Sequence, residues 1–452
     1  MKNSVRNLVN RRSFFHTAGF AALPFWADET LEAATQHVNT NSKPSELKIT
    51  DLRVAVVAGA PMTCPLIRID TNQGIYGLGE VRDGASKNYA LMLKSRLLGE
   101  NPCNVDKVFR KIKQFGGHAR QGGGVCGIEM ALWDLAGKAY NVPVYQMLGG
   151  KFRDQVRCYA DTTMSSDPKV FAQRLKDRID KKGFTFLKMD LGVGLVEKIP
   201  GTVSRPLGTS SANFRNVQHM FTGMELTDKG VALMANYVAQ VREVIGMEVP
   251  LAADHFGHIG VNSCIRLARA LEKYNMAWLE DMIPWQYPDL MKKITDAVDV
   301  PILTGEDIYL KEEFIRLARM QAVDMLHPDL ATSGGILETK KIGDAIQELG
   351  VPMAMHFAGT PVSFMANVHC AAATENFVAL EHHSVDVAWW EDMVHGDKPL
   401  FEKGFARIPE KPGLGVTLNE EVVKQHLHKD HPGYFEPTKE WDTYQGNDRL
   451  WS

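Results

Sequence analysis

The chain has 452 residues, of which 44% are hydrophobic and 23% are charged, the composition of a soluble globular protein with a large core. This length exceeds one ordinary domain, so two or three are expected. The formal net charge of -3 gives no electrostatic reason to expect a nucleic-acid partner, and no segment of the sequence has the roughly 20 consecutive apolar residues of a membrane span.

The first 27 residues have the pattern of an export signal. Arg11 and Arg12 precede a modest apolar stretch at residues 14–26, and Ala27 is followed by an acid. This pattern resembles a twin-arginine signal, which exports proteins that have already folded. We therefore expect a periplasmic protein; if the arginine pair is incidental, the alternative is a cytoplasmic one. Residues 28–47 are polar and alanine-rich, and we expect a linker there.

Residues 48–150 predict a small α+β domain. Residues 48–57 alternate in hydrophobicity, and residues 65–80 predict two short strands around an Asn-Gln-Gly turn, which is a hairpin signal. Helical spacing follows at residues 86–115. The apolar spacing near residues 128–136 predicts a further helix that is buried.

Residues 151–384 predict a (β/α)8 barrel. Strand-like units centre near residues 156, 186, 251, 277, 302, 324, 353 and 378, with helical spacing between them. Residues 193–225 interrupt this rhythm and are too long for an ordinary loop, so we expect an insertion. Residues 385–452 are expected to return to the first domain. The six cysteines are scattered without a C-x-x-C motif, so we expect free, mostly buried thiols.

Three of the strand-like units end in acid at equal spacing. Asp254 ends VPLAAD, Glu280 lies in MAWLED and Glu306 lies in VPILTGED, with 26 residues from each of these acids to the next. The C-terminal ends of barrel strands converge on one face, so the three carboxylates are expected in one mouth. Taken singly, each acid fits a helix N-cap or a solvated loop. Together they repel one another unless a cation lies between them, and hard oxygen ligands suit Mg²⁺.

A family resemblance rests on motifs that occur in a fixed order. They are ALWDLAGK, KMDLG, AAD, WLED, TGED, HPDLATSGGILETKKIG, MHFAGTP and ALEHH. Over about residues 48–427 the chain resembles the mandelate racemase/muconate lactonizing branch of the enolase superfamily. The resemblance implies an α+β capping domain on a modified TIM barrel, one Mg²⁺ per subunit and removal of the proton α to a carboxylate. It also implies a small-molecule carboxylate substrate and a homo-oligomer.

The resemblance assigns the metal ligands and the catalytic base. Asp254, Glu280 and Glu306 match the three metal ligands. Asp329 and His356 match the Asp–His dyad on the sixth and seventh strands. We expect His356 to act as the base, because imidazole titrates near neutral pH and a carboxylate partner fixes its tautomer.

Two further residues are expected to stabilise the charge that develops on the substrate. Lys188 matches the first lysine of the K-x-K motif on the second barrel strand, and Glu381 matches the acid on the eighth strand that hydrogen-bonds the substrate. We expect Lys188 to supply a positive charge and a protonated Glu381 to donate a hydrogen bond.

Asp190 stands where the family motif has its second lysine. Racemases of the mandelate type use that lysine as a second base, and an ionised Asp190 beside a metal is a poor proton donor. One-base chemistry remains, in which His356 removes the α-proton and a β-hydroxyl leaves. Many relatives are such dehydratases of sugar acids, either aldonates or aldarates, and form 2-keto-3-deoxy acids.

His258 shares the strand parity of Asp254 and is a candidate acid for the leaving group.

Two other functions stay open at this point. The first is a racemase, epimerase or cycloisomerase of a hydroxy acid that uses Asp190 or a distant group as its second base. The second is a non-catalytic, exported sugar-acid-binding protein that keeps the fold.

Overall fold

The computed structural model describes residues 42–205, 223–254, 256 and 259–450. The predicted export signal at residues 1–27 lies outside these residues, as does most of the predicted linker. Among the helices of the described ranges, none is both long enough and apolar enough to cross a membrane. All six cysteines are free, and five of them are buried.

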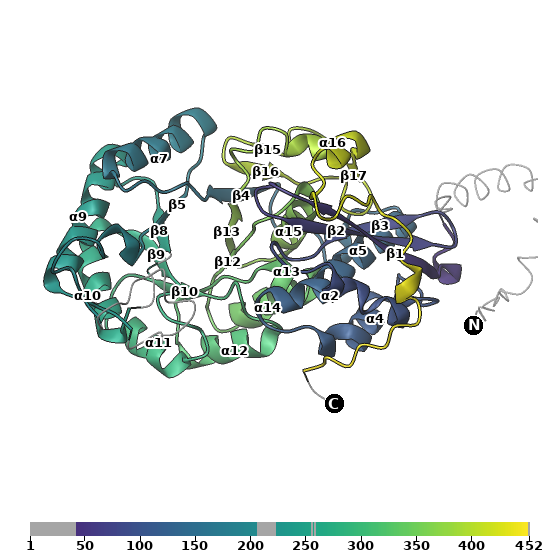
Figure 1. The fold of residues 1–452 in the computed structure, drawn as a ribbon, viewed down its shortest axis with the longest axis horizontal. Helices are drawn as coiled ribbons and strands as arrows, with labels where there is room; N and C mark the ends of the chain where they lie inside the picture. Colours follow the sequence, from purple (N-terminus) through teal and green to yellow (C-terminus); the bar gives the residue numbers. More distant parts are fainter. Residues whose placement is uncertain (1–41, 206–222, 255, 257–258, 451–452) are drawn as a thin grey trace, which may run out of the picture.

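Eight parallel strands close into a barrel, which confirms the predicted fold class (Figure 1). The strands follow one another in chain order around the barrel, and the eighth pairs with the first through Leu380 and Cys158. They are β4 (Gln155–Ala160), β5 (Leu187–Asp190), β8 (Leu251–Asp254), β9 (Met276–Glu280), β10 (Ile302–Thr304), β11 (Met325–Leu326), β12 (Met353–Met355) and β13 (Phe377–His382). Each lies where the sequence places a strand-like unit.

Helices lie between successive barrel strands and cover the outside of the barrel (Figure 1). They are α7 (Pro168–Lys182), α9 (Asp228–Ile245), α10 (Val261–Leu271), α11 (Pro288–Thr295), α12 (Lys311–Met320), α13 (Leu330–Ser333), α14 (Ile336–Gln347) and α15 (Pro361–Ala373). The ends of the predicted insertion form a two-stranded antiparallel ribbon of β6 (Val203–Ser204) and β7 (Glu225–Leu226). Residues 206–222 of that insertion lie outside the described residues.

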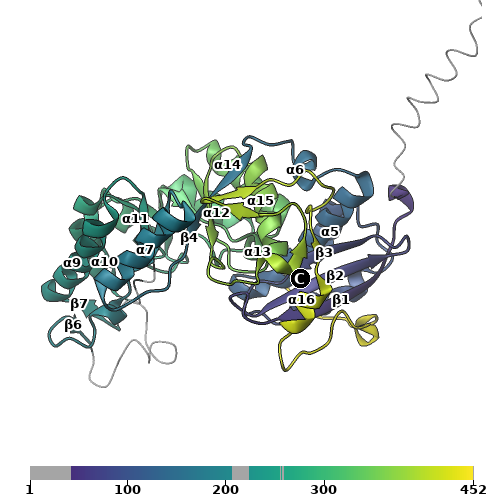
Figure 2. The same ribbon diagram turned by 90° about the horizontal axis from the view of Figure 1, so that it is seen from above.

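The capping domain is a three-stranded antiparallel sheet with helices on one face. The sheet consists of β1 (Ile49–Val57), β2 (Cys64–Thr71) and β3 (Tyr76–Glu80), and the predicted hairpin joins β2 to β3. The helices are α2 (Asn88–Leu91), α3 (Lys94–Leu97), α4 (Val105–Ile112), α5 (Gly123–Tyr140) and α6 (Val144–Met147). The sheet and the helices α9 to α11 lie at opposite ends of the molecule (Figure 2).

The C-terminal segment contacts both halves of the molecule. Strand β16 (Phe405–Arg407) pairs antiparallel with barrel strand β4, and β15 (Phe401–Glu402) pairs with β16. Further along, β14 (Val394–His395) pairs with β17 (Thr417–Leu418), and α16 (Glu420–Gln425) follows. The chain then runs along β1, where the backbone N–H of His428 donates to Val56 O at 2.8 Å.

Helix α5 is buried along almost its whole length, and its acids bind backbone groups of its neighbours. Asp134 accepts from the N–H groups of Leu78 and Leu414, both at 2.9 Å, and so joins β3 to the C-terminal segment. Glu129 accepts from Ile336 N at 2.6 Å and Leu337 N at 3.0 Å, which are unpaired donors of the first turn of α14. These two acids therefore connect α5 to three other parts of the fold.

Strand β3 approaches helix α5 so closely that a side chain has no room between them. A Cβ atom built on Gly79 would lie 2.0 Å from Gly127 O. We expect Gly79→Ala to lower the free energy of unfolding by at least about 2 kcal/mol, because the strand and helix must separate. Gly194→Ala is the matched control, since no atom lies within 4 Å of its added Cβ, and its effect should stay within about 0.5 kcal/mol. Equal effects of the two substitutions in urea unfolding would contradict this packing.

Glu80 joins the capping sheet to the barrel. Its carboxylate accepts from Thr360 N at 3.1 and 3.2 Å and from the Thr360 hydroxyl, at the start of α15. Burial raises the pKa of Glu80 to about 8, although the hydrogen bonds from Thr360 oppose the shift. The unfolded chain loses this proton near pH 4.5. Between these pH values the unfolded state binds fewer protons, so this group lowers stability as pH rises.

We expect this effect to disappear in Glu80→Gln, which cannot ionise. We compare the free energy of unfolding of the wild type minus that of Glu80→Gln. This difference should decrease between about pH 5 and about pH 8, by up to about 1 kcal/mol per pH unit. Urea unfolding of both proteins at a series of pH values measures this difference. A difference that does not change with pH would show that Glu80 is already ionised in the folded protein.

Candidate active site

The barrel places its polar residues one layer above an apolar floor. The floor consists of inward-facing side chains, namely Tyr159, Phe186, Ala252, Trp278, Leu303, Ala354 and Ala379. Side chains of a strand alternate between faces, so the residue two positions further along also faces inward. Those positions hold Asp161, Lys188, Asp254, Glu280, Gly305, His356 and Glu381, and β11 adds His327. The alternation therefore brings most of the sequence-predicted site residues into one mouth.

Glu306 reaches the mouth by a different route, because it lies one residue beyond the inward position on β10. Gly305 has φ +150°, and a Cβ there would lie 3.0 Å from backbone atoms of His327. The chain therefore turns at a glycine that has no side chain to clash, and Glu306 enters the mouth. Asp281 does the same after β9 with φ +48°, a left-handed conformation that aspartate tolerates.

Lys188 lies at the centre of one group of carboxylates. Its Nζ is 2.6 Å from Glu381 Oε1, 3.1 Å from Asp254 Oδ2 and 3.5 Å from Glu280 Oε1. Burial alone would lower the pKa of Lys188, but the charges of Glu280, Glu381 and Asp254 outweigh burial and raise the pKa well above its ordinary value. Lys188 therefore carries a positive charge in the barrel mouth, as the sequence predicts.

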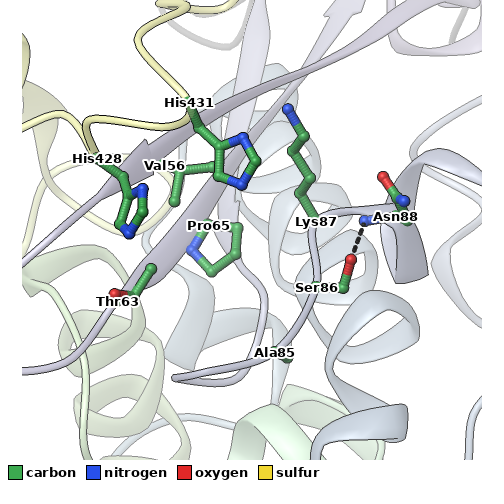
Figure 3. A pocket seen from close by; sticks show the side chains of 9 residues that line it. All are labelled: Val56, Thr63, Pro65, Ala85, Ser86, Lys87, Asn88, His428 and His431. Carbon is green, nitrogen blue, oxygen red and sulfur yellow. Dashed lines mark hydrogen bonds between the residues drawn. The ribbon is translucent and has the colours of Figure 1, made fainter.

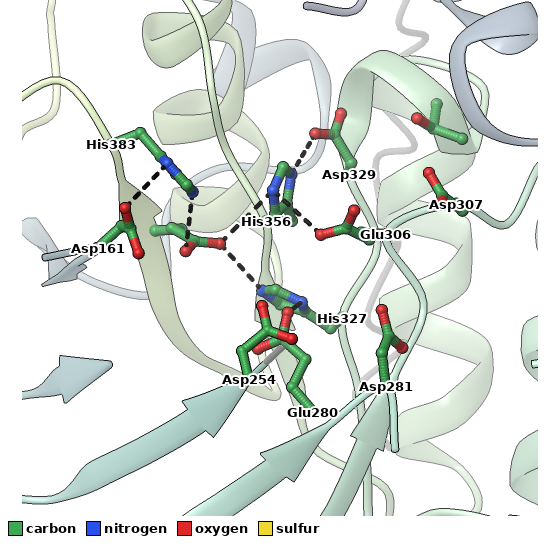
Figure 4. A network of polar contacts seen from close by, with 12 residues as sticks. Asp161, Asp254, Glu280, Asp281, Glu306, Asp307, His327, Asp329, His356 and His383 are labelled. Carbon is green, nitrogen blue, oxygen red and sulfur yellow. Dashed lines mark hydrogen bonds and ion pairs between the residues drawn. The ribbon is translucent and has the colours of Figure 1, made fainter. Parts of the chain in front are cut away.

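His356 and Asp329 form the expected pair beside Glu306 (Figure 4). His356 Nδ1 lies 2.5 Å from Asp329 Oδ2, and its Nε2 lies 3.2 Å from Glu306 Oε2. Burial alone would lower the pKa of His356, but Glu306 and Glu381 outweigh burial and raise the pKa to about 10. Glu306 is the largest of the groups that raise this pKa, and Asp329 adds to the increase through its hydrogen bond and its charge, so the pKa of His356 depends on what else Glu306 binds.

A group of carboxylates that could hold a cation lies between Lys188 and His356. Glu280, Asp281 and Glu306 each present an oxygen, and these oxygens lie within 4.8 Å of one another. Asp281 directly follows Glu280 in the sequence, and its left-handed backbone is what directs it to the same side. Asp254, the remaining predicted ligand, is held next to Glu280 through Lys188.

Arg82 is a site residue that sequence reasoning missed. It comes from the capping domain, its side chain is 0% exposed, and it donates to Glu306 O at 2.8 Å and to the Thr332 hydroxyl. Its guanidinium also lies 3.5 Å from Asp329 Oδ2 and 3.3 Å from Glu306 Oε1. Arg82 therefore fixes the partner of the candidate base and one candidate metal ligand. Its position just after the end of β3 gave no signal in the sequence, because its contacts with the barrel exist only through the packing of the two domains.

The environment of Glu381 favours an ionised carboxylate, whereas the sequence led us to expect a protonated one. Its Oε1 contacts Lys188 at 2.6 Å and His383 at 3.1 Å, and its Oε2 accepts from the Tyr159 hydroxyl at 3.1 Å. Burial alone would raise the pKa of Glu381, but the charges of Lys188, His383 and His356 outweigh burial and lower it well below its ordinary value. The expected neutral hydrogen-bond donor is therefore an ionised acceptor.

His327 and Tyr159 were also missed, and they support the carboxylates from below. His327 Nδ1 lies 3.0 Å from Glu280 Oε1, and its Nε2 lies 2.6 Å from the Tyr159 oxygen. Both side chains are fully buried. The Trp278 indole donates to the other oxygen of Glu280 at 3.0 Å, so Glu280 is held from two sides.

The remaining two predicted site residues are placed differently. Asp190 ends β5 in register with Asp254 at the end of β8 and is half-buried. His258, the candidate leaving-group acid, lies outside the described residues.

A separate pocket on the capping side has a different chemistry. It measures about 160 Å³ and lies where the chain near Lys87 meets the C-terminal segment with His428 and His431 (Figure 3). None of the described residues that line it has a carboxylate. The acid-rich barrel mouth is therefore the candidate active site.

Fold and site together define a class of protein. Proteins of this class have a (β/α)8 barrel and an α+β capping domain. Acids at the ends of the barrel strands and an Asp–His pair lie in the same barrel mouth. Residues 170–422 match the family model described as enolase C-terminal domain-like, and residues 31–149 match the mandelate racemase/muconate lactonizing enzyme N-terminal domain. The chain belongs to the mandelate racemase/muconate lactonizing enzyme branch of the enolase superfamily, which confirms the resemblance seen in the sequence.

Several known proteins are similar to this chain over most of their length. It is 35% identical over 391 residues to D-xylonate dehydratase of Haloferax volcanii, covering 84% of this chain and 89% of that protein. It is 26% identical over 391 residues to arabinonate dehydratase of Saccharolobus solfataricus, covering 84% and 94%. The crystal structure of a mandelate racemase/muconate lactonizing enzyme-like protein from Rubrobacter xylanophilus has 31% identity and a TM-score of 0.75, over 86% of this chain and 99% of that chain.

The role of Arg82 generates a prediction about stability. Arg82→Met removes a fully buried positive charge that faces the carboxylates of Asp83, Asp329 and Glu306, so we expect the free energy of unfolding to fall by about 3 kcal/mol or more. Arg120→Met is the matched control, because Arg120 also pairs with Asp83 but its side chain is 43% exposed; its loss should cost less than about 1 kcal/mol. Urea unfolding of the two variants compares them, and a small effect of Arg82→Met would contradict the bridging role.

Proposed function

We propose that the protein is a Mg²⁺-dependent hydro-lyase that dehydrates a sugar acid. It removes the proton α to the carboxylate, expels the β-hydroxyl as water and forms a 2-keto-3-deoxy acid. The observation that carries this proposal is the position of the His356–Asp329 pair 3.2 Å from Glu306, which belongs to the carboxylate group that could hold the cation. The names of the two relatives, a xylonate and an arabinonate dehydratase, support an aldonate as the substrate.

The carboxylates in the mouth fit Mg²⁺. Ligand oxygens at 2.0–2.1 Å from Mg²⁺ lie at most about 4.2 Å apart, and those of Glu280, Asp281 and Glu306 lie within 4.8 Å of one another. A small closure of these side chains therefore suffices. Glu280 and Glu306 of this group would hold the ion with Asp281 beside them. Asp254, the third ligand expected from the sequence, is not among these three and would reach the ion from the Lys188 side. When bound, the ion supplies positive charge to the carboxylate oxygens of the substrate, where negative charge develops.

The side chains around the proposed ion site have separate roles in the reaction. His356 takes the α-proton at Nε2, because Asp329 occupies Nδ1 and sets the orientation of the ring. Lys188 adds a fixed positive charge next to the developing negative charge. Glu381 keeps Lys188 and His356 in place through contacts at 2.6 and 3.8 Å. Arg82 fixes Asp329 and so the base.

A racemase or epimerase remains the alternative, and it requires a second base on the other face of the α-carbon. Asp190 occupies the position of the lysine that family racemases use. A carboxylate there can accept a proton but is a poor donor in the return direction. For this reason dehydration is the better proposal.

The test is an assay of the purified protein with Mg²⁺ against a panel of aldonates and aldarates that includes D-xylonate. We expect a 2-keto acid from at least one aldonate, loss of activity with EDTA and recovery on addition of Mg²⁺. His356→Asn should lower the rate by about 10²- to 10⁴-fold, the usual contribution of a general base. Recovery of the C2 epimer, with solvent deuterium at C2 and no 2-keto acid, would instead establish the racemase.

A further inference from the structure

A second Asp–His pair lies across the barrel mouth from the first. His383 directly follows β13 and Asp161 directly follows β4, the two strands whose pairing closes the barrel. His383 Nδ1 lies 3.3 Å from Asp161 Oδ2 (Figure 4). The pairing of Glu381 with Tyr159 and of His382 with Ala160 brings these residues together although 222 positions separate them in the chain.

The two histidines that follow Glu381 have different environments. His383 has the strand parity of Glu381 and lies in the mouth, where its side chain is 14% exposed. His382 points to the opposite side and packs against Phe364 and Trp390 at 4.9 and 4.8 Å between ring centroids. Burial lowers the pKa of His382 to about 3, so it is a neutral core residue, whereas His383 belongs to the site.

His383 is held between two carboxylates. Its Nε2 lies 3.1 Å from Glu381 Oε1, while Asp161 occupies Nδ1. Burial alone would lower the pKa of His383, but the charges of Glu381 and Asp161 outweigh burial and raise it. Glu381 Oε1 also contacts Lys188 at 2.6 Å, so this oxygen keeps a cationic partner when His383 gives up its proton.

The imidazole rings of His356 and His383 are close enough to act on neighbouring carbon atoms of one substrate molecule. The ring centroids of His356 and His383 are 5.7 Å apart. His383 lies next to Oε1 of Glu381 and His356 lies next to Oε2, at 3.1 and 3.8 Å. Bonded carbons are about 1.5 Å apart, and a catalytic nitrogen acts over about 3 Å. One ring can therefore reach the α-hydrogen while the other reaches the hydroxyl on the β-carbon.

From this arrangement we propose that His383, oriented by Asp161, is the acid that protonates the departing β-hydroxyl. The proposal rests on the dehydratase function proposed above. His356 takes the proton from C2, and the electron pair of the C2–H bond forms the C2–C3 double bond as the C3–O bond breaks. The oxygen takes the Nε2 proton of His383 and leaves as water. The enol then becomes the 2-keto-3-deoxy acid, and both histidines exchange protons with solvent.

The test separates proton removal from hydroxyl departure with two substrates and one exchange reaction. The substrates are D-xylonate, or whichever aldonate of the panel reacts fastest, and its 3-deoxy-3-fluoro analogue, because fluoride leaves without a proton from an acid. In His383→Asn we expect loss of water to slow by about 100-fold or more. Loss of fluoride should slow by less than about tenfold, and deuterium from ²H₂O should still enter C2 of recovered substrate through His356.

Two variants control for damage to the fold. Asp161→Asn keeps the ring of His383 but removes its partner, so it should show the same selective loss of water elimination at a smaller magnitude. His431→Asn makes the same change at an exposed histidine on the capping side and should leave all three rates unchanged. Thermal unfolding of each variant shows whether it folds.

Several outcomes would overturn the proposal. Equal losses of water and fluoride elimination in His383→Asn would show a structural role, and unchanged water elimination would show no role. If His258→Asn alone gave the selective loss, the acid would be His258. Absence of any 2-keto acid from the wild type would overturn the dehydratase function and this proposal with it, whereas failure of His383→Asn to behave as expected leaves the dehydratase function intact.

Discussion

The balance of charge in the barrel mouth is the constraint on which the rest of the site depends. Glu280 and Glu381 are fully buried and Asp254 nearly so, and buried carboxylates are costly unless cations face them. Lys188 faces all three of these acids, and Arg82 and His356 face Glu306 on the other side. The oxygens of Glu280, Asp281 and Glu306 lie within 4.8 Å of one another, and burial together with the neighbouring carboxylates raises the pKa of Asp281 well above its ordinary value. A divalent cation between these oxygens would offset their repulsion.

The capping domain contributes to the chemistry as well as covering the barrel. Arg82 inserts a buried guanidinium between Asp329 and Glu306, so the proposed base and the proposed cation site are both held by one residue from outside the barrel. Glu80 binds Thr360, the N-cap of α15, which follows His356 closely in the chain. The position of His356 therefore depends on the packing of the two domains against each other.

The sequence predicted the barrel and its three acids because both follow from short-range patterns, whereas Lys188, Asp329, His356 and Glu381 were identified through the resemblance to a known family. Strands repeat with a regular spacing, and acids that end successive parallel strands must meet at one face, which predicts Asp254, Glu280 and Glu306 in one mouth. The protonated state of Glu381 was expected wrongly, because it depends on Lys188 and His383 lying against the same carboxylate. Arg82 and Asp281 were missed, since one needs the packing of two domains and the other a left-handed backbone.

The sequence by itself determined the fold class and many of the residues that line the barrel mouth, because alternation along a strand and recurrence of strands fix which side chains face inward. Motifs in a fixed order determined the family. Only the tertiary structure decided which charges touch. Closure of β13 onto β4 joins Asp161 to His383, and docking of the capping domain joins Arg82 to Asp329. These pairs involve residues hundreds of positions apart, and the free energy of a charge pair depends on distance and burial, which no local pattern specifies.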